Sequence, residues 1–120
     1  MKVLRAFPPN YRAINNAFRI RGKGVVICYG SIIYNPDNVI VGPELHVHEA
    51  VHSQRQGADP ERWWWQYIGS KKFRLEEEIP AHRAEARFAP ALAEKIAARL
   101  SSDLYGRMIS FDEALKVIAP

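Results

Sequence analysis

Two histidines four residues apart, with a glutamate directly after the first, constrain this chain more than any other feature of its sequence. The segment reads His48-Glu49-Ala50-Val51-His52. Residues four apart lie on one face of an α-helix, so both imidazoles can reach a single tetrahedral zinc ion if the segment is helical. Glu49 would then lie beside the ion, placed to accept a proton from a water that the metal activates. The pattern predicts a metal-bearing helix and hydrolytic chemistry.

The residues around this pattern predict where its helix begins and ends. Gly42 and Pro43 form a break that can open a helix, and Gly57 can close one. We therefore expect a helix over residues 43–56. Its apolar face, expected to pack against the core, comprises Val47, Ala50 and Val51, and its other face, expected to border a cleft, comprises Leu45, His48, Glu49, His52 and Gln56.

A catalytic zinc ion commonly has three protein ligands, so a third ligand is needed. A histidine six residues after His52 is absent, because that position is Ala58. A later helix offers carboxylates instead. Pro80 is tolerated in the first turn of a helix, which places the start of that helix near residue 77 or 78 and its body from 81 to about 88. We predict Glu78 as the third ligand, and the alternatives that stay open are Glu77, His82 and Glu85.

These residues together resemble a known family. His48-Glu49-x-x-His52, followed by a glutamate about one helix later, resembles the gluzincin arrangement of zincin metallopeptidases. The stretch from Glu78 through Ala81 to Arg87-Phe88-Ala89-Pro90 is similar to small minimal zincins encoded in phages, prophages and toxin or immunity loci. The match spans roughly residues 25–90. It departs from the thermolysin-type second motif, because Glu77 and not asparagine precedes Glu78.

The resemblance implies a zinc-dependent metallopeptidase that holds one zinc ion per chain and uses Glu49 as its general base. It also implies a minimal zincin-like fold. The oxyanion stabiliser is not determined by the pattern, and a hydroxyl or cationic donor would serve. The candidates are Tyr34, Tyr67, Arg83 and Tyr105.

Periodicity and turn residues predict an α+β domain that spans residues 1–120. The short sheet, antiparallel or mixed, would pack on the metal helix and on the following glutamate-bearing helix, with extra helices at the C-terminal side. A helix is expected to start after Asp59-Pro60, and Ser110 with Glu113 forms a capping box for the last one. The remaining expected elements are a helix over 11–18, strands over 25–29, 32–34 and 39–41, and a helix over 91–100.

Composition constrains the number of domains, the cellular compartment and the kinds of partner that we expect. The chain has 120 residues, 48% of them hydrophobic, which suits one domain with one core. Cys28 is the single cysteine, which fits a reducing compartment. We see neither a signal peptide nor an apolar run long enough to span a membrane, so we expect a cytoplasmic protein, with virion association as the other possibility. The net charge of +4 comes from dispersed basic residues, which argues against nucleic-acid binding.

A run of aromatic residues raises a second hypothesis. Trp63, Trp64 and Trp65 are consecutive in the expected helix that reaches Ile68, so they cannot all face one core. At least one indole should be exposed or lie at an interface. The alternative function is therefore a phage virion or complex component, an interaction module that binds a protein partner through this helix and keeps a structural or idle metal site.

Overall fold

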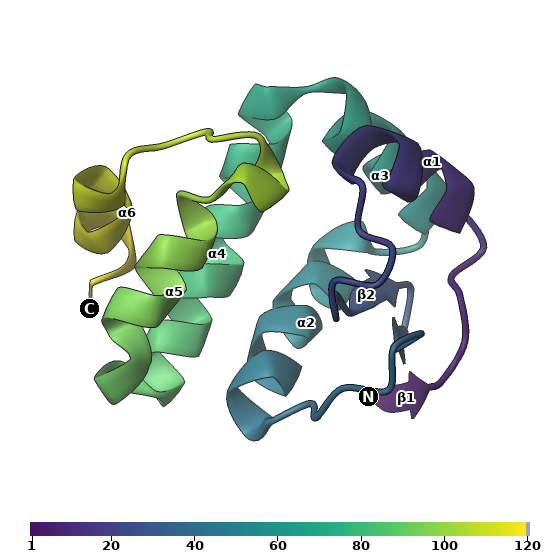
Figure 1. Ribbon diagram of the computed structural model, residues 1–120, viewed down its shortest axis with the longest axis horizontal. Helices are drawn as coiled ribbons and strands as arrows, with labels where there is room; N and C mark the ends of the chain where they lie inside the picture. Colours follow the sequence, from purple (N-terminus) through teal and green to yellow (C-terminus); the bar gives the residue numbers. More distant parts are fainter. Residues whose placement is uncertain (120) are drawn as a thin grey trace.

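Two long helices run side by side through the middle of the molecule and carry the predicted metal ligands (Figure 1). They are α2 (Pro43–Gln56) and α4 (Lys71–Phe88), and α4 also packs against α3, α5 and α6. The computed structural model describes residues 1–119. Because α4 packs against four other helices, many of its side chains lie in the interior.

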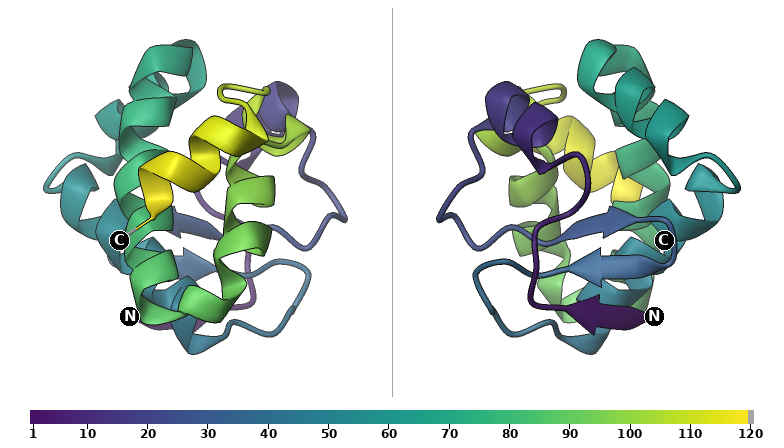
Figure 2. Two further views of the ribbon diagram at one scale, coloured as in Figure 1. Left: turned by 90° about the vertical axis from the view of Figure 1, so that its left-hand side faces the viewer. Right: turned by 90° about the vertical axis from the view of Figure 1, so that its right-hand side faces the viewer.

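A small mixed sheet lies beside α2 (Figure 2). It comprises β1 (Lys2–Leu4), β2 (Ile27–Tyr29) and β3 (Ile32–Tyr34) in the order β1-β3-β2. β1 runs parallel to β3, with Val3 opposite Ile33, and β2 runs antiparallel to β3, with Cys28 opposite Ile33. The predicted α+β class is confirmed, and the expected strands over 25–29 and 32–34 are found as β2, which begins two residues later, and β3. β1 was not predicted, because three residues are too few to show an alternating pattern.

The remaining helices follow the expected start signals. The Asp59 carboxylate accepts the Arg62 backbone N–H, and the Ser110 hydroxyl accepts that of Glu113, so both predicted N-caps are confirmed. The bounds are α1 (Tyr11–Phe18), α3 (Pro60–Gly69), α5 (Ala93–Leu100) and α6 (Phe111–Ile118), with two short 3₁₀ helices, η1 (Pro90–Leu92) and η2 (Asp103–Tyr105).

The predicted start of α4 is wrong. Ser70 caps the helix by accepting the Phe73 backbone N–H, so α4 begins at Lys71 and Pro80 lies in its interior. A proline there removes the backbone bond to residue 76 and crowds the preceding turn, at a cost of about 3 kcal/mol. The packing of α4 against four other helices offsets that cost. In this segment, tertiary packing outweighs the preference of proline for the first turn of a helix.

The predicted strand over 39–41 is also wrong. The Asn35 side chain accepts the Val39 backbone N–H at 3.0 Å and donates to the Val39 carbonyl at 2.8 Å. Both groups that would pair in a sheet are therefore already bonded. Ile40 points into solvent with 94% of its surface exposed. The segment is an extended connection into α2 and not a strand.

The interior contains two hydrophobic clusters and a set of buried polar groups. One cluster is centred on Trp63, Trp64 and Tyr67, and the other on Ile96, Leu100 and Ile118. The expectation that the apolar face of α2 packs inward is wrong. The buried residues of α2 are His48, Glu49, His52 and Gln56. A helix that buries its polar face must satisfy those groups inside the protein.

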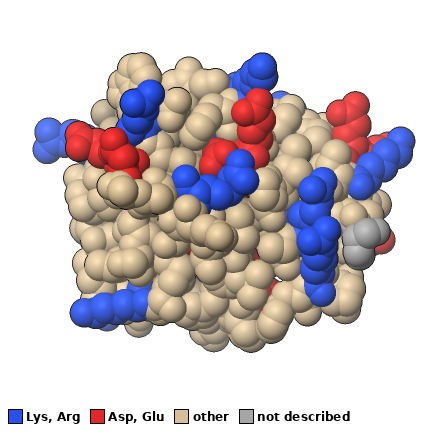
Figure 3. All heavy atoms as spheres, turned by 180° about the vertical axis from the view of Figure 1, so that it is seen from behind, with Lys and Arg blue, Asp and Glu red and all other residues tan. Residues whose placement is uncertain are grey.

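The surface carries dispersed charge. On the face shown in Figure 3, lysine and arginine side chains are spread over the surface, and several lie beside acidic ones. Among residues 1–119, no helix is both long and apolar enough to cross a membrane.

Candidate metal centre

Three side-chain atoms converge where α2 faces α4. The Nε2 atoms of His48 and His52 lie 3.2 Å apart. The Oε1 atom of Glu78 lies 3.3 Å from the first and 3.0 Å from the second. The histidines are one helical turn apart on α2, and the glutamate projects from the middle of α4. His48, His52 and Glu78 thus form a buried group able to hold a metal ion.

The triangle of atoms fits tetrahedral zinc. Ligand atoms at about 2.0–2.1 Å from a tetrahedral ion lie roughly 3.3 Å from one another. The three observed separations, 3.0 to 3.3 Å, come within a few tenths of an ångström of that value. Two imidazoles and one carboxylate are also a donor set typical of catalytic zinc, in which a fourth position stays open. These residues therefore fit the metal that the sequence pattern predicts.

Burial sets the electrostatics of this group. His48 and Glu78 are each 3% exposed. Burial alone would lower the pKa of His48, but its bonds to Glu78 and Glu85 outweigh that effect and raise the pKa to about 10. Burial would likewise raise the pKa of Glu78, but His52 and His48 hold it well below its usual range. The Glu78 carboxylate therefore stays ionised, and a buried anion of this kind is stabilised by a positively charged partner.

Further side chains orient the ligands. His48 Nδ1 donates to Glu85 Oε1 at 2.8 Å, which orients Nε2 toward the converging atoms. Glu85 is in turn paired with Arg99 of α5. On the other side, the Tyr67 hydroxyl of α3 donates to Glu78 Oε2 at 2.5 Å. Two of the three ligands are therefore fixed from outside by hydrogen bonds.

The alternative ligands take other roles. Glu85 supports His48 as described above. Glu77 accepts hydrogen bonds from Arg55, at 2.8 and 3.0 Å, and from the Trp63 indole at 2.7 Å. His82 is completely buried, and its Nδ1 donates to the Glu78 backbone carbonyl at 2.7 Å. Burial lowers the pKa of His82 to about 3, so this ring is neutral. None of these three residues belongs to the converging group.

Glu49 lies next to the ligating atoms without joining them. Its Oε2 is 3.7 Å from His48 Nε2, and its side chain lines the same cavity. Burial raises the pKa of Glu49 above its usual value, so it is a stronger base than a solvated glutamate. The position suits a group that accepts a proton from a molecule at the open metal position.

Two of the four candidate oxyanion stabilisers line the cavity, and the other two do not. Tyr34 lies in β3 outside the cavity, and Arg83 donates to the Val117 carbonyl. Tyr67 lines the cavity but is bound to Glu78. Tyr105 also lines the cavity, from η2. Burial raises the pKa of Tyr105 well above its usual value, so its hydroxyl keeps the proton it would donate.

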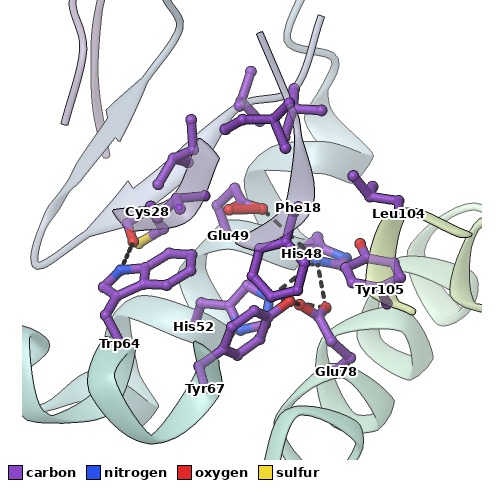
Figure 4. Close-up of a pocket in the computed structure, with 15 residues that line it drawn as sticks. Phe18, Cys28, His48, Glu49, His52, Trp64, Tyr67, Glu78, Leu104 and Tyr105 are labelled. Atoms are coloured by element: carbon purple, nitrogen blue, oxygen red, sulfur yellow. Dashed lines mark hydrogen bonds and ion pairs between the residues drawn. The ribbon is translucent and has the colours of Figure 1, made fainter. Parts of the chain in front are cut away.

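A small cavity lies over the three ligating atoms (Figure 4). Its volume is about 70 Å³. Its polar lining comes from α2 and α4, with the hydroxyl-bearing side chains of Tyr67 from α3 and Tyr105 from η2. The rest of the wall is apolar, from Ile14, Phe18, Ile20, Val25, Val26, Ile27 and Leu104.

The three consecutive tryptophans differ in their exposure, as expected for adjacent positions on a helix. Trp63 and Trp64 are buried, and the Trp64 indole donates to the Cys28 carbonyl at 3.0 Å. Trp65 is 77% exposed and borders a surface groove together with Ile68 and Phe73. The prediction of at least one exposed indole is confirmed, and Trp65 is the residue concerned.

Comparison with family models, curated proteins and solved structures found no match for this chain.

Proposed function

We propose that this chain is a zinc-dependent metallopeptidase of the gluzincin type, with a minimal zincin-like domain. The observation that carries the proposal is the convergence of His48 Nε2, His52 Nε2 and Glu78 Oε1 within 3.3 Å of one another. Among residues 1–119, Glu49 is the one carboxylate besides Glu78 that lines the cavity. The set contains a metal site with an open position and an adjacent base, which is what hydrolysis requires.

Each residue has a defined task in the proposed reaction. Bound zinc would act as a Lewis acid that lowers the pKa of water and polarises a peptide carbonyl. Glu49 accepts the proton of the attacking water and delivers it to the leaving amine. Tyr105, which lines the cavity, donates from its hydroxyl to the charge that develops on the carbonyl oxygen. Glu85 and Tyr67 hold the ligands in place.

Peptide binding would use the free edge of β2. β2 pairs only with β3, so its other edge faces α2. The Cys28 carbonyl on that edge already accepts bonds from Gln56 and Trp64. An extended peptide would therefore pair with the start of β2 at Ile27, which lines the cavity.

The test compares conservative changes at this site. Glu49→Gln should lower the cleavage rate of fluorescently labelled casein by at least 10³-fold while zinc content stays at one ion per chain. His48→Ala and Glu78→Ala should lose the zinc, as measured by metal mass spectrometry. Glu76→Gln is the matched control, because Glu76 is an exposed glutamate of the same acidic run. A Glu49→Gln protein that cleaves casein at the wild-type rate would contradict the mechanism.

The exposed Trp65 supports the second candidate, an interaction module with a structural zinc site. A large exposed indole beside an apolar groove is typical of partner surfaces. If this candidate is correct, wild type holds one zinc ion, casein is not cleaved, and Trp65→Ala abolishes retention of a partner that Glu49→Gln still retains. Since Trp64 is buried, a change there would report on folding and not on binding.

A further inference from the structure

The cavity over the metal ligands is too small for a polypeptide. Its volume is about 70 Å³. Pockets that accept small ligands commonly measure roughly 300–1,000 Å³. His48, His52 and Glu78 are each no more than 5% exposed. A peptide therefore reaches them only when one wall of the cavity moves.

One wall is held by buried polar bonds. Glu78 of α4 bonds His52 of α2 at 3.0 Å and Tyr67 of α3 at 2.5 Å. β2 is fastened to the same helices, because the Cys28 carbonyl accepts a bond from Trp64 of α3. Moving this wall would leave buried polar groups without partners. It is the rigid side of the cavity.

The part of the wall formed by η2 is fastened as well. Leu104 and Tyr105 line the cavity from this side. Arg74 of α4 is buried and donates through Nη1 to the Tyr105 carbonyl at 2.9 Å. The same guanidinium also bonds the backbone carbonyls of Tyr67 and Ile68. η2 is thereby tied to the metal-binding helices.

The opposite wall lacks such ties. It is residues 14–26, the cover segment, which includes most of α1 and the loop to β2. Among residues 1–119, the cover segment makes no hydrogen bond or ion pair to α2, α3 or α4. Its polar contacts lie elsewhere: the Arg21 N–H donates to Asn15, and the Gly24 N–H donates to Asp37. The residues that it places on the cavity are Ile14, Phe18, Ile20, Val25 and Val26.

Phe18 makes the aromatic contacts between the cover segment and the rigid side. Its ring lies edge-on to that of Tyr67, with centroids 5.8 Å apart. The Arg74 guanidinium lies 4.7 Å from the centroid of the Phe18 ring. Tyr67 is the residue that holds Glu78, and the close-up shows both around the cavity that Phe18 lines (Figure 4). Apolar and aromatic contacts can separate without leaving buried hydrogen-bonding groups unpaired.

We propose that the cover segment is a lid over the metal centre and that Phe18 is its latch. The closed lid excludes polypeptides and slows exchange of the metal, and it must lift before a substrate reaches His48 and Glu49. The inference rests on the proposed function for its substrate, whereas closure over the metal is testable without any substrate.

The test measures how fast zinc leaves the protein. Zinc-loaded wild type and Phe18→Ala are mixed with excess 4-(2-pyridylazo)resorcinol, and the coloured zinc complex is followed in time. Phe18→Ala should release zinc at least tenfold faster, because the lid opens more often. Phe111→Ala is the matched control, since Phe111 lies on α6 and lines no part of the cavity. Ile96→Val controls for general destabilisation from the second cluster. Both controls should release zinc within twofold of wild type.

The outcomes separate the lid from the peptidase. Equal release from wild type, Phe18→Ala and Phe111→Ala overturns the lid, even if casein is cleaved. Faster release from Phe18→Ala without any cleavage of casein supports the lid and contradicts the peptidase. If Phe18→Ala does not fold, Phe18→Leu keeps the apolar bulk without the ring and should release zinc at least threefold faster. A wild type that takes up no zinc overturns both proposals.

Discussion

At the scale of single residues, some members of the site could be predicted from their spacing in the sequence, and others are placed only by tertiary packing. His48, Glu49 and His52 could be predicted because helical periodicity alone places them, and the structure puts both imidazoles on one turn of α2. Glu78 was one of several candidates, and its carboxylate does meet the two imidazoles. Tyr67 was one of four candidate donors to the substrate, and its hydroxyl donates to Glu78. Only the packing of α3 against α4 reveals that role.

Removing the Tyr67 hydroxyl tests this assignment. Tyr67→Phe keeps the ring in the first hydrophobic cluster and deletes only the bond to Glu78 Oε2. We expect zinc affinity to fall by about 10- to 100-fold, the usual effect of losing a group that orients a metal ligand. A competition titration against a chelator of known affinity measures the change.

Tyr34→Phe is the control for this prediction. Tyr34 lies in β3 and does not line the cavity, so its loss should leave zinc affinity unchanged. Equal affinities for Tyr67→Phe and wild type would show that Glu78 needs no support from α3.

The elements were predicted where local signals and packing agree. Residues 43–56 and the helix after Asp59 have breaks at their ends, and both helices are found as expected. α4 departs from the prediction, because a proline in a helix interior is unfavourable by itself and becomes tolerable only through contacts far along the chain. Arg99 was missed for a similar reason. It reaches Glu85 from a separate helix, and no spacing in the sequence signals that pairing.

The helix strain at Pro80 gives a measurable prediction. Pro80→Ala restores the backbone N–H that can bond to the residue 76 carbonyl and removes the steric clash, so we expect a gain of about 1–3 kcal/mol in the free energy of unfolding. Urea denaturation followed by circular dichroism measures it. Pro60→Ala is the comparison, because Pro60 occupies the first turn of α3, where proline is favourable. A loss of stability in Pro80→Ala would mean that the helix geometry around Glu78 depends on the proline.

At the scale of the whole molecule, the buried polar residues of α2 and α4 lie between two separate hydrophobic clusters. Residues of α3 belong to the first hydrophobic cluster, and residues of α5 and α6 belong to the second. Between these helices in sequence, α4 supplies Glu78 and Glu85, and α2 faces them with His48 and His52. Buried carboxylates are costly when they lack a full counter-charge. A divalent cation at this position should therefore stabilise the entire fold.

Metal removal tests that expectation. Free zinc at 100 times the dissociation constant adds about 2.7 kcal/mol to the free energy of unfolding, provided that the unfolded chain does not bind it. For a chain of this size the melting temperature should fall by roughly 10 °C when a chelator removes the metal. Differential scanning calorimetry with and without EDTA measures the shift. Because a metal held by His48, His52 and Glu78 would join α2 to α4, its loss should appear as one cooperative transition at lower temperature, not as the melting of a single helix.

Two histidine variants decide whether the shift comes from the proposed centre. His52→Ala removes a ligand, so its melting temperature should no longer respond to EDTA. His46→Ala removes a histidine that lies two residues before His48 and outside the converging group, so it should keep the full response. If His52→Ala retains the shift, zinc stabilises the protein from another place. If both variants lose it, His46 takes part in binding the metal and the three-residue centre is incomplete.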